Sequence, residues 1–282
     1  MYTLNCKGRL WVIERPLVMG IINTTPDSFY AASRKQSVDE ALNLATKMLA
    51  DGADILDIGG QSTRPGSQQI TADEEAEKVL PVIEAFVSKN PDAVISIDTF
   101  YASVAQQAVK AGASIVNDIS GGTLDKQMLQ AVAALNVPYI CMHMKGNPTN
   151  MQQFAHYENV VKEVVEYFID KVEQCRLAGI KDVIIDAGFG FAKTSTHNLV
   201  LLENLSLLKM LGKPILAGLS RKGTIYKTLG ITAAEALNGT TVLNTIALMK
   251  GADILRVHDV KEAVEAVKLG AAYNEANYRE SL

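Results

Sequence analysis

One short phrase recurs three times along this chain, and it limits the folds that the chain can adopt. It reads GADILD at residues 52–57, GASIVN at residues 112–117 and GADILR at residues 251–256. Each time, a glycine that ends a helix leads into a brief apolar run, as in a strand that is buried on both faces. Each run ends in polar residues. The phrase therefore predicts parallel strands that deliver polar side chains to one edge of a sheet.

Five further apolar runs bring the number of predicted strands to eight. They are Leu17–Asn23, Val94–Asp98, Tyr139–His143, Val183–Asp186 and Ile215–Ser220. Helical periodicity fills the stretches between the runs, and capping-box signals at Ser37/Glu40, Thr71/Glu74 and Asp259/Glu262 predict helix starts. Eight strands that alternate with helices over about 250 residues predict an α/β fold, the (β/α)8 TIM barrel. A doubly wound open sheet shares this alternation and remains the alternative.

The segment before the first run, Leu4–Ile13, predicts a small N-terminal β-hairpin that turns at Lys7 and Gly8. We expect this hairpin to close the floor of the barrel. No linker rich in Pro, Gly or Ser and no low-complexity tract divides the chain, so the sequence predicts one domain over residues 1–282.

Charge and composition limit the possible binding partners of the protein and the cellular compartment in which it is expected. The net charge is −4 without a basic cluster, which argues against nucleic acid. The N-terminus lacks the pattern of a signal peptide, and no apolar run approaches about 18 residues, so we expect a cytoplasmic protein that does not enter a membrane. The three cysteines, Cys6, Cys141 and Cys175, are too scattered for a zinc site and are expected to be reduced core residues.

Polar residues follow all eight predicted strands, at the rim where barrels carry their active sites. Asp98, Asn117 and Asp186 are rich in acceptor atoms and would suit a flat heterocycle with N–H donors. A second group is cationic or hydroxylic and lies partly on the last two strands, where barrels often bind phosphate; its members are Thr63, Arg64, Lys222, Arg256 and His258. Asn23 offers a neutral oxygen to a hard cation such as Mg²⁺. These residues predict a substrate with a polar ring and a phosphate, and a reaction that releases the phosphate.

Eight motifs in this order resemble those of the dihydropteroate synthase family, and the likeness runs from about Val18 to Val267. The motifs are Asn23–Phe29, Gly59–Gly66, Ser96–Thr99, Asn117–Ile119, Met142–Met144, Asp186–Phe191, Ser220–Lys222 and Arg256–His258. The resemblance implies an enzyme of folate biosynthesis that joins 4-aminobenzoate to 6-hydroxymethyl-7,8-dihydropterin diphosphate. It implies that the carbon–oxygen bond breaks first, so that a pterin-stabilised carbocation forms before the amine attacks. It also implies Mg²⁺ as cofactor, a homodimer and membership of a family that sulfonamides target, while the departures described below leave open how well sulfonamides fit.

The resemblance assigns roles by position. The catalytic residues would be Asp98, Asp186 and Lys222, and the pterin would be held by Asp98, Asn117, Asp186, Lys222 and Arg256. The diphosphate would be held by Thr63, Arg64, Arg256 and His258, and the aminobenzoate by Phe29, Pro65, Phe191 and Lys222. Asn23 would anchor the metal.

Some positions depart from the usual family pattern, namely Tyr30–Ser33, Gln61, Ala187 and Gly223, and they bear on loop closure rather than on chemistry. Simpler interpretations also exist: an Asp or Asn at a strand end can cap a helix, Phe191 can pack the rim, and His143 can support the core. Two other functions stay open on the sequence alone, a pterin-dependent methyltransferase and a non-catalytic pterin-binding paralogue.

Overall fold

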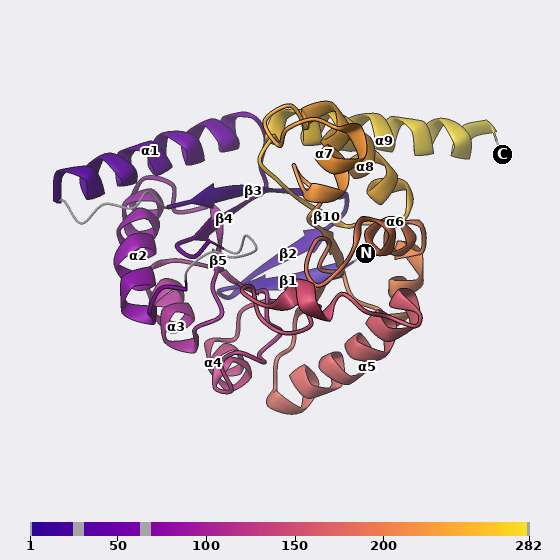
Figure 1. The fold of residues 1–282 in the computed structure, drawn as a ribbon. Helices are drawn as coiled ribbons and strands as arrows, with labels where there is room; N and C mark the ends of the chain where they lie inside the picture. The colour runs from indigo at the N-terminus through magenta and orange to yellow at the C-terminus, as the bar shows by residue number, and fades with distance from the viewer. Residues whose placement is uncertain (1, 25–30, 63–68, 281–282) are drawn as a thin grey trace.

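The protein is a closed barrel of parallel strands surrounded by helices (Figure 1). The computed structural model describes residues 2–24, 31–62 and 69–280, with the backbone alone for residues 31–37 and 277–280. The barrel strands are β3 (Leu17–Asn23), β4 (Ile55–Gly59), β5 (Val94–Asp98), β6 (Ile115–Asp118), β7 (Tyr139–Met142), β8 (Val183–Asp186), β9 (Ile215–Ala217) and β10 (Ile254–Val257). Each pairs in parallel with the next, and β10 pairs with both β9 and β3. The closed ring confirms the TIM barrel and excludes the open sheet.

The helices follow the strands in alternation and form the outer ring (Figure 1). They are α1 (Ala31–Ala50), α2 (Ala72–Lys89), α3 (Ala102–Ala111), α4 (Met128–Leu135), α5 (Val160–Ala178), α6 (Ser195–Glu203), α7 (Gly223–Leu229), α8 (Leu237–Met249) and α9 (Val260–Glu280), with 3₁₀ turns η1 (Met151–Phe154) and η2 (Leu205–Leu211). The capping box at Thr71 and Glu74 is confirmed. The predicted start at Ser37 is wrong, because α1 begins at Ala31 in a run of good helix formers.

The third, fourth and sixth residues of the repeated phrase have distinct structural roles. In two copies the third residue is an aspartate that accepts a backbone N–H at the start of a neighbouring strand. Asp54 Oδ2 accepts from the N–H of Val18, and Asp253 Oδ2 accepts from the N–H of Ile215, both at 2.9 Å. Its fourth residue is an isoleucine of the buried floor cluster in all three copies. Because side chains alternate along a strand, the sixth residue lies on the same inner face, one layer nearer the mouth. The barrel is thus apolar at its floor and polar above it.

The N-terminal hairpin is confirmed. Strands β1 (Tyr2–Cys6) and β2 (Arg9–Ile13) pair antiparallel around Lys7 and Gly8, whose φ angles of 55° and 85° form a tight turn. Leu4 of the hairpin belongs to the floor cluster, together with Cys6 and Ile13. The N–H of Asn5 donates to Asp182 Oδ2 at 2.7 Å, just before β8. The hairpin therefore closes the floor, as the sequence predicts.

The three cysteines are free and buried, which confirms them as core residues. Across the described part of the chain, no helix is long and apolar enough to cross a membrane.

Candidate active site

A buried network of charges lies on the inner face of the barrel, one layer above its apolar floor. Arg256 donates from Nε and Nη2 to Asp57 Oδ2, each at 2.6 Å, and Nη2 also donates to Asp98. Asn117 Nδ2 donates to the same Asp57 oxygen at 3.0 Å. These residues come from β4, β5, β6 and β10, so barrel closure brings together side chains that lie up to 199 positions apart.

Burial governs the ionisation of this network. It raises the pKa of Asp98 to about 7, although the nearby Arg256 guanidinium favours the charged carboxylate. Burial disfavours the charged guanidinium too, but the carboxylates of Asp57 and Asp98 outweigh it and raise the pKa of Arg256 above its usual value. Arg256 therefore remains a cation between two carboxylates, and the site keeps fixed charge in a place from which water is largely excluded.

Asp186, Lys222 and Arg256 converge around Gly218. A Cβ atom at Gly218 would lie 3.7 Å from Lys222 Nζ, 3.9 Å from Asp186 Oδ2 and 4.0 Å from Arg256 Cβ. The other Asp186 oxygen, Oδ1, accepts from the N–H of Gly188 at 2.8 Å. Burial raises the pKa of Asp186, while Lys222 opposes that shift. The missing side chain at Gly218 leaves room where two opposite charges face each other.

Lys222 begins α7 and links this charged cluster to the loop that joins β8 to α6. Its Nζ donates to the carbonyl of Phe189 and lies 4.8 Å from the centre of the Phe191 ring. Burial lowers the pKa of Lys222 to about 8, against the attraction of Asp186. The structure therefore brings together Phe191 and Lys222, two of the residues predicted for the aminobenzoate, and Phe191 is only 8% exposed.

The remaining predicted residues fall on the rim or outside the described residues. Asn23 is exposed at the end of β3, and His258 is exposed after β10. The N–H of His258 donates to Ser220 Oγ at 3.1 Å, and its ring Nδ1 lies 3.0 Å from the same oxygen. The predictions for Phe29, Thr63, Arg64 and Pro65 lie outside the described residues.

Two residues of the site were not predicted. Asp57 has no exposed surface, holds Arg256 and Asn117, and carries one oxygen, Oδ1, without a hydrogen-bond partner in the described structure. Its signal was present in the sequence, since Asp57 occupies the same position of the repeated phrase as Asn117 and Arg256. Lys193 belongs to the β8–α6 loop, and its side chain is buried. No sequence signal marks it, because a lysine in a predicted loop is usually exposed.

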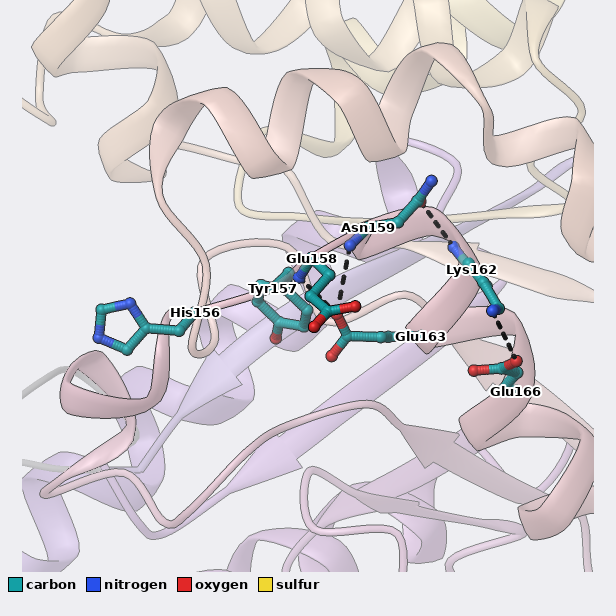
Figure 2. A pocket seen from close by; sticks show the side chains of 7 residues that line it. All are labelled: His156, Tyr157, Glu158, Asn159, Lys162, Glu163 and Glu166. Atoms are coloured by element: carbon teal, nitrogen blue, oxygen red, sulfur yellow. Dashed lines mark hydrogen bonds and ion pairs between the residues drawn. The ribbon is translucent and has the colours of Figure 1, made fainter.

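A separate hollow of about 500 Å³ opens at the start of α5 (Figure 2). It is lined by His156, Tyr157, Glu158, Asn159, Lys162, Glu163 and Glu166, and no predicted site residue is among them. Nearby, Lys145 Nζ donates to Glu163 at 2.7 Å and lies 3.7 Å from the centre of the Tyr157 ring. Lys162 of the hollow pairs with Glu166, and Glu163 pairs with Lys145. We assign the active site to the barrel interior instead, where buried opposite charges converge.

The chain belongs to the family of pterin-binding enzymes, whose sequence profile matches residues 19–258. Within that family it is similar to dihydropteroate synthases: the one of Escherichia coli strain K12 is 41% identical over 268 residues, which cover 94% of both chains. The solved structure of Xanthomonas albilineans dihydropteroate synthase with 4-aminobenzoic acid has a TM-score of 0.89 at 39% identity and covers 96% of this chain and 98% of that one. The Yersinia pestis enzyme in complex with a sulfonamide drug has a TM-score of 0.91 at 39% identity, covering 97% and 100%.

These likenesses confirm the predicted family and activity. The chain is a transferase of folate biosynthesis that makes dihydropteroate. The relatives named above match nearly the whole chain, and each is a dihydropteroate synthase. This favours the synthase over a pterin-dependent methyltransferase and over a non-catalytic pterin-binding paralogue.

Proposed function

We propose that the barrel mouth joins the two substrates by an SN1-like route. The carbon–oxygen bond of 6-hydroxymethyl-7,8-dihydropterin diphosphate breaks first, and diphosphate leaves with the bonding electron pair. The amine of 4-aminobenzoate then attacks the pterin methylene cation and loses a proton. The observation that carries this proposal is the buried Asp98 carboxylate beside Arg256, because a preorganised negative charge stabilises a cation that develops next to it.

The pterin ring would lie over Asn117 and Asp186. Asn117 donates its amide N–H to Asp57, which leaves the amide oxygen to accept from a ring N–H. Asp186 has Oδ1 engaged by Gly188, while Oδ2 borders the space at Gly218 with Lys222. Two acceptors and one cation in a buried cluster match a heterocycle that presents both N–H donors and acceptor atoms.

The aminobenzoate would lie against Phe191 and Lys222, with Phe29 and Pro65 completing its slot. The contact between Phe191 and Lys222 supports this assignment, as does the likeness to a synthase that was solved with 4-aminobenzoic acid. The Yersinia pestis relative binds a sulfonamide drug, and we propose that sulfonamides bind this chain in the same slot.

The diphosphate would lie toward the rim, held by Thr63, Arg64, Arg256 and His258. Within the described residues, no group of three His, Cys, Asp or Glu side chains could hold a metal ion by itself. This fits Mg²⁺ held mainly by waters and by the diphosphate, with the amide oxygen of Asn23 as a protein ligand. When bound, Mg²⁺ would neutralise charge on the departing diphosphate.

We further propose that the protein forms a homodimer. Exposed apolar side chains gather on η2 and α8, namely Leu207, Met210, Val242 and Met249. The C-terminal end of α8 lies near η2, since Lys209 of η2 lies against Gly251, and Lys250 pairs at 2.5 Å with Glu203, the last residue of α6. Met249→Glu should convert a dimer to a monomer in analytical ultracentrifugation. A wild-type chain that is monomeric at micromolar concentration would contradict the proposal.

The decisive test is a single-turnover experiment on Asp98→Asn. Loss of one preorganised electrostatic group should raise the barrier to bond breaking by about 2.7–4 kcal/mol, which is about a hundredfold to a thousandfold in rate. Both dihydropteroate and hydroxymethyl-dihydropterin are measured, because water can also capture the cation. Asp92→Asn, at an exposed carboxylate near the floor, serves as the matched control. Bond breaking at the wild-type rate in Asp98→Asn would refute the proposed role of Asp98.

A further inference from the structure

Lys193 is a buried cation that none of the proposed substrate contacts uses. Its side chain is 3% exposed. Nζ donates to the carbonyls of Gly188 at 3.0 Å and Phe191 at 3.1 Å, and it lies 2.8 Å from His143 Nδ1. The ammonium group therefore connects the end of β7 to both ends of the turn at residues 188–191.

The protonation states of this cluster follow from its geometry. The ammonium group donates to the carbonyls of Gly188 and Phe191 and to His143 Nδ1, and the carbonyl of His143 is a more distant acceptor at 3.4 Å. Because an ammonium nitrogen cannot accept a hydrogen bond, His143 accepts at Nδ1 and carries its proton at Nε2. Burial lowers the pKa of His143 to about 2, with a further contribution from Lys193, so the imidazole is neutral. Burial also lowers the pKa of Lys193 to about 7, while Asp186 favours its charged form.

The loop that Lys193 holds has an unfavourable backbone conformation. Ala192 adopts a φ of 49°, which is uncommon for a residue other than glycine. Gly188 has a φ of 67°, and a Cβ atom there would lie 2.0 Å from the carbonyl oxygen of His143. Such a close and strained turn persists only where its surroundings fix it. The hydrogen bonds from Lys193 to the carbonyls of Gly188 and Phe191 supply that constraint.

The same loop carries the wall of the aminobenzoate slot. The carbonyl of Phe189 accepts from Lys222, and the ring of Phe191 lies 4.8 Å from Lys222 Nζ. A Cβ atom at Gly190 would lie 3.2 Å from Lys222 Cδ, so the Lys222 side chain runs closely along the loop. A shift of the loop would displace both its contacts with Lys222.

We propose that Lys193 is a positioning residue that fixes the shape of the aminobenzoate slot. Through the carbonyls of Gly188 and Phe191, it holds the loop where the Phe191 ring meets Lys222, and His143 orients the lysine in turn. This inference rests on the proposed function, in which Phe191 and Lys222 contact the aminobenzoate.

Lys193→Met tests the proposal by separating the two substrates. Methionine retains the apolar stem but not the donors, so KM for 4-aminobenzoate should rise about tenfold, equivalent to about 1.4 kcal/mol. KM for the pterin diphosphate and the single-turnover rate of bond breaking should stay within about twofold. Lys171→Met is the matched control, because Lys171 is a buried lysine of α5 whose ammonium group bonds Gln174 of the same helix. Equal losses for both substrates, or an unchanged KM for 4-aminobenzoate, would overturn the proposal.

A pair of changes at His143 tests the same device without altering the lysine. His143→Asn retains a side-chain acceptor, whereas His143→Phe removes it, so only the second should reproduce the rise in KM for 4-aminobenzoate. An equal effect of the two changes on KM for 4-aminobenzoate would overturn the role of the acceptor. This test remains decisive even if Lys193→Met does not fold.

Phe191→Ala separates this inference from the proposed slot. If Phe191→Ala raises KM for 4-aminobenzoate and Lys193→Met does not, Lys193 has no positioning role; if Phe191→Ala leaves KM unchanged, the slot assignment itself fails.

Discussion

Asp57 and Arg256 form a buried ion pair across the inside of the barrel. The Asp57 side chain has no exposed surface, and its Oδ2 atom lies 2.6 Å from both Nε and Nη2 of the guanidinium group. Asp98 shares the same Arg256. The pair therefore couples Arg256, which we assign to substrate binding, with an aspartate whose carboxylate bonds Arg256 and Asn117.

Asp57→Ala should destabilise the fold strongly. Removing one partner of a buried ion pair costs about 3–5 kcal/mol, and the lower end applies here because Asp98 still neutralises Arg256. Urea unfolding followed by circular dichroism measures the loss. Asp92→Ala breaks the exposed Arg9–Asp92 pair and should change stability by at most about 1 kcal/mol. Equal effects of the two substitutions would contradict a structural role for the buried pair.

Asp186→Ala should weaken pterin binding by about 1.5–3 kcal/mol, the range for a hydrogen bond to a charged group. Isothermal titration calorimetry with a pterin gives the affinity, and circular dichroism confirms that the variant folds. The N–H of Gly188 also loses its acceptor in this variant, so the affinity for 4-aminobenzoate is measured alongside. An unchanged pterin affinity in a folded variant would place the ring elsewhere.

The pH dependence of kcat/KM for the pterin diphosphate should be bell-shaped. Burial raises the pKa of Asp98 to about 7, and its charged form is the active one, so activity should fall as the pH drops below about 7. Burial lowers the pKa of Lys222 to about 8, and its protonated form is the one that donates to Phe189, so activity should fall as the pH rises above about 8. Lys222→Arg should move the alkaline limb upward, because arginine stays protonated. An alkaline limb that does not move would assign it to another group.

Glu75 should make stability depend on pH. It is buried in α2, where Thr99 Oγ1 donates to its Oε2 atom at 2.5 Å, and burial raises its pKa from 4.5 to about 7. The folded chain therefore holds a proton that the unfolded chain releases above pH 4.5, so this contribution is complete below pH 4.5 and is lost as the pH rises to about 7. The loss amounts to about 3–4 kcal/mol, because each pKa unit of the shift from 4.5 to about 7 is worth about 1.4 kcal/mol.

Glu75→Gln cannot ionise at this position. Its melting temperature relative to the wild type should therefore increase between pH 4.5 and pH 7.5, by about 2–4 °C for each kcal/mol. Glu84→Gln, at an exposed residue of the same helix, should show no such trend. Parallel melting curves for Glu75→Gln and the wild type across this range would show that Glu75 ionises freely in the folded protein.

Much of the architecture follows from local sequence patterns. Strands β3, β5 and β8 have their predicted bounds, because each is a buried apolar run closed by a polar residue. Strand β9 ends at Ala217, three residues earlier than predicted, since the chain turns at Gly218 to place Lys222 at the start of α7. An apolar run does not itself show where strand pairing stops.

The site was predictable where it depends on position along a strand, and not where it depends on contacts across the barrel. Asn117 and Arg256 were predicted from their place near the polar ends of apolar runs, and Asp57 occupies the equivalent position of the repeated phrase. Its ion pair joins β4 to β10, and that contact exists only once the sheet has closed. Lys193 is similar, because the acceptors that make its burial favourable come from the folded loop and from His143, which directly follows β7.

Because the hairpin closes the floor of the barrel, the active site opens to solvent at one end only. Leu4, Cys6 and Ile13 fill the end opposite the active-site rim, so both substrates must enter, and both products must leave, past the same loops. Ligand traffic is then sequential: the products have to leave before a new pair of substrates can load. Departure of the products therefore competes with arrival of the next substrates, and turnover can be limited by product release even when bond breaking is fast.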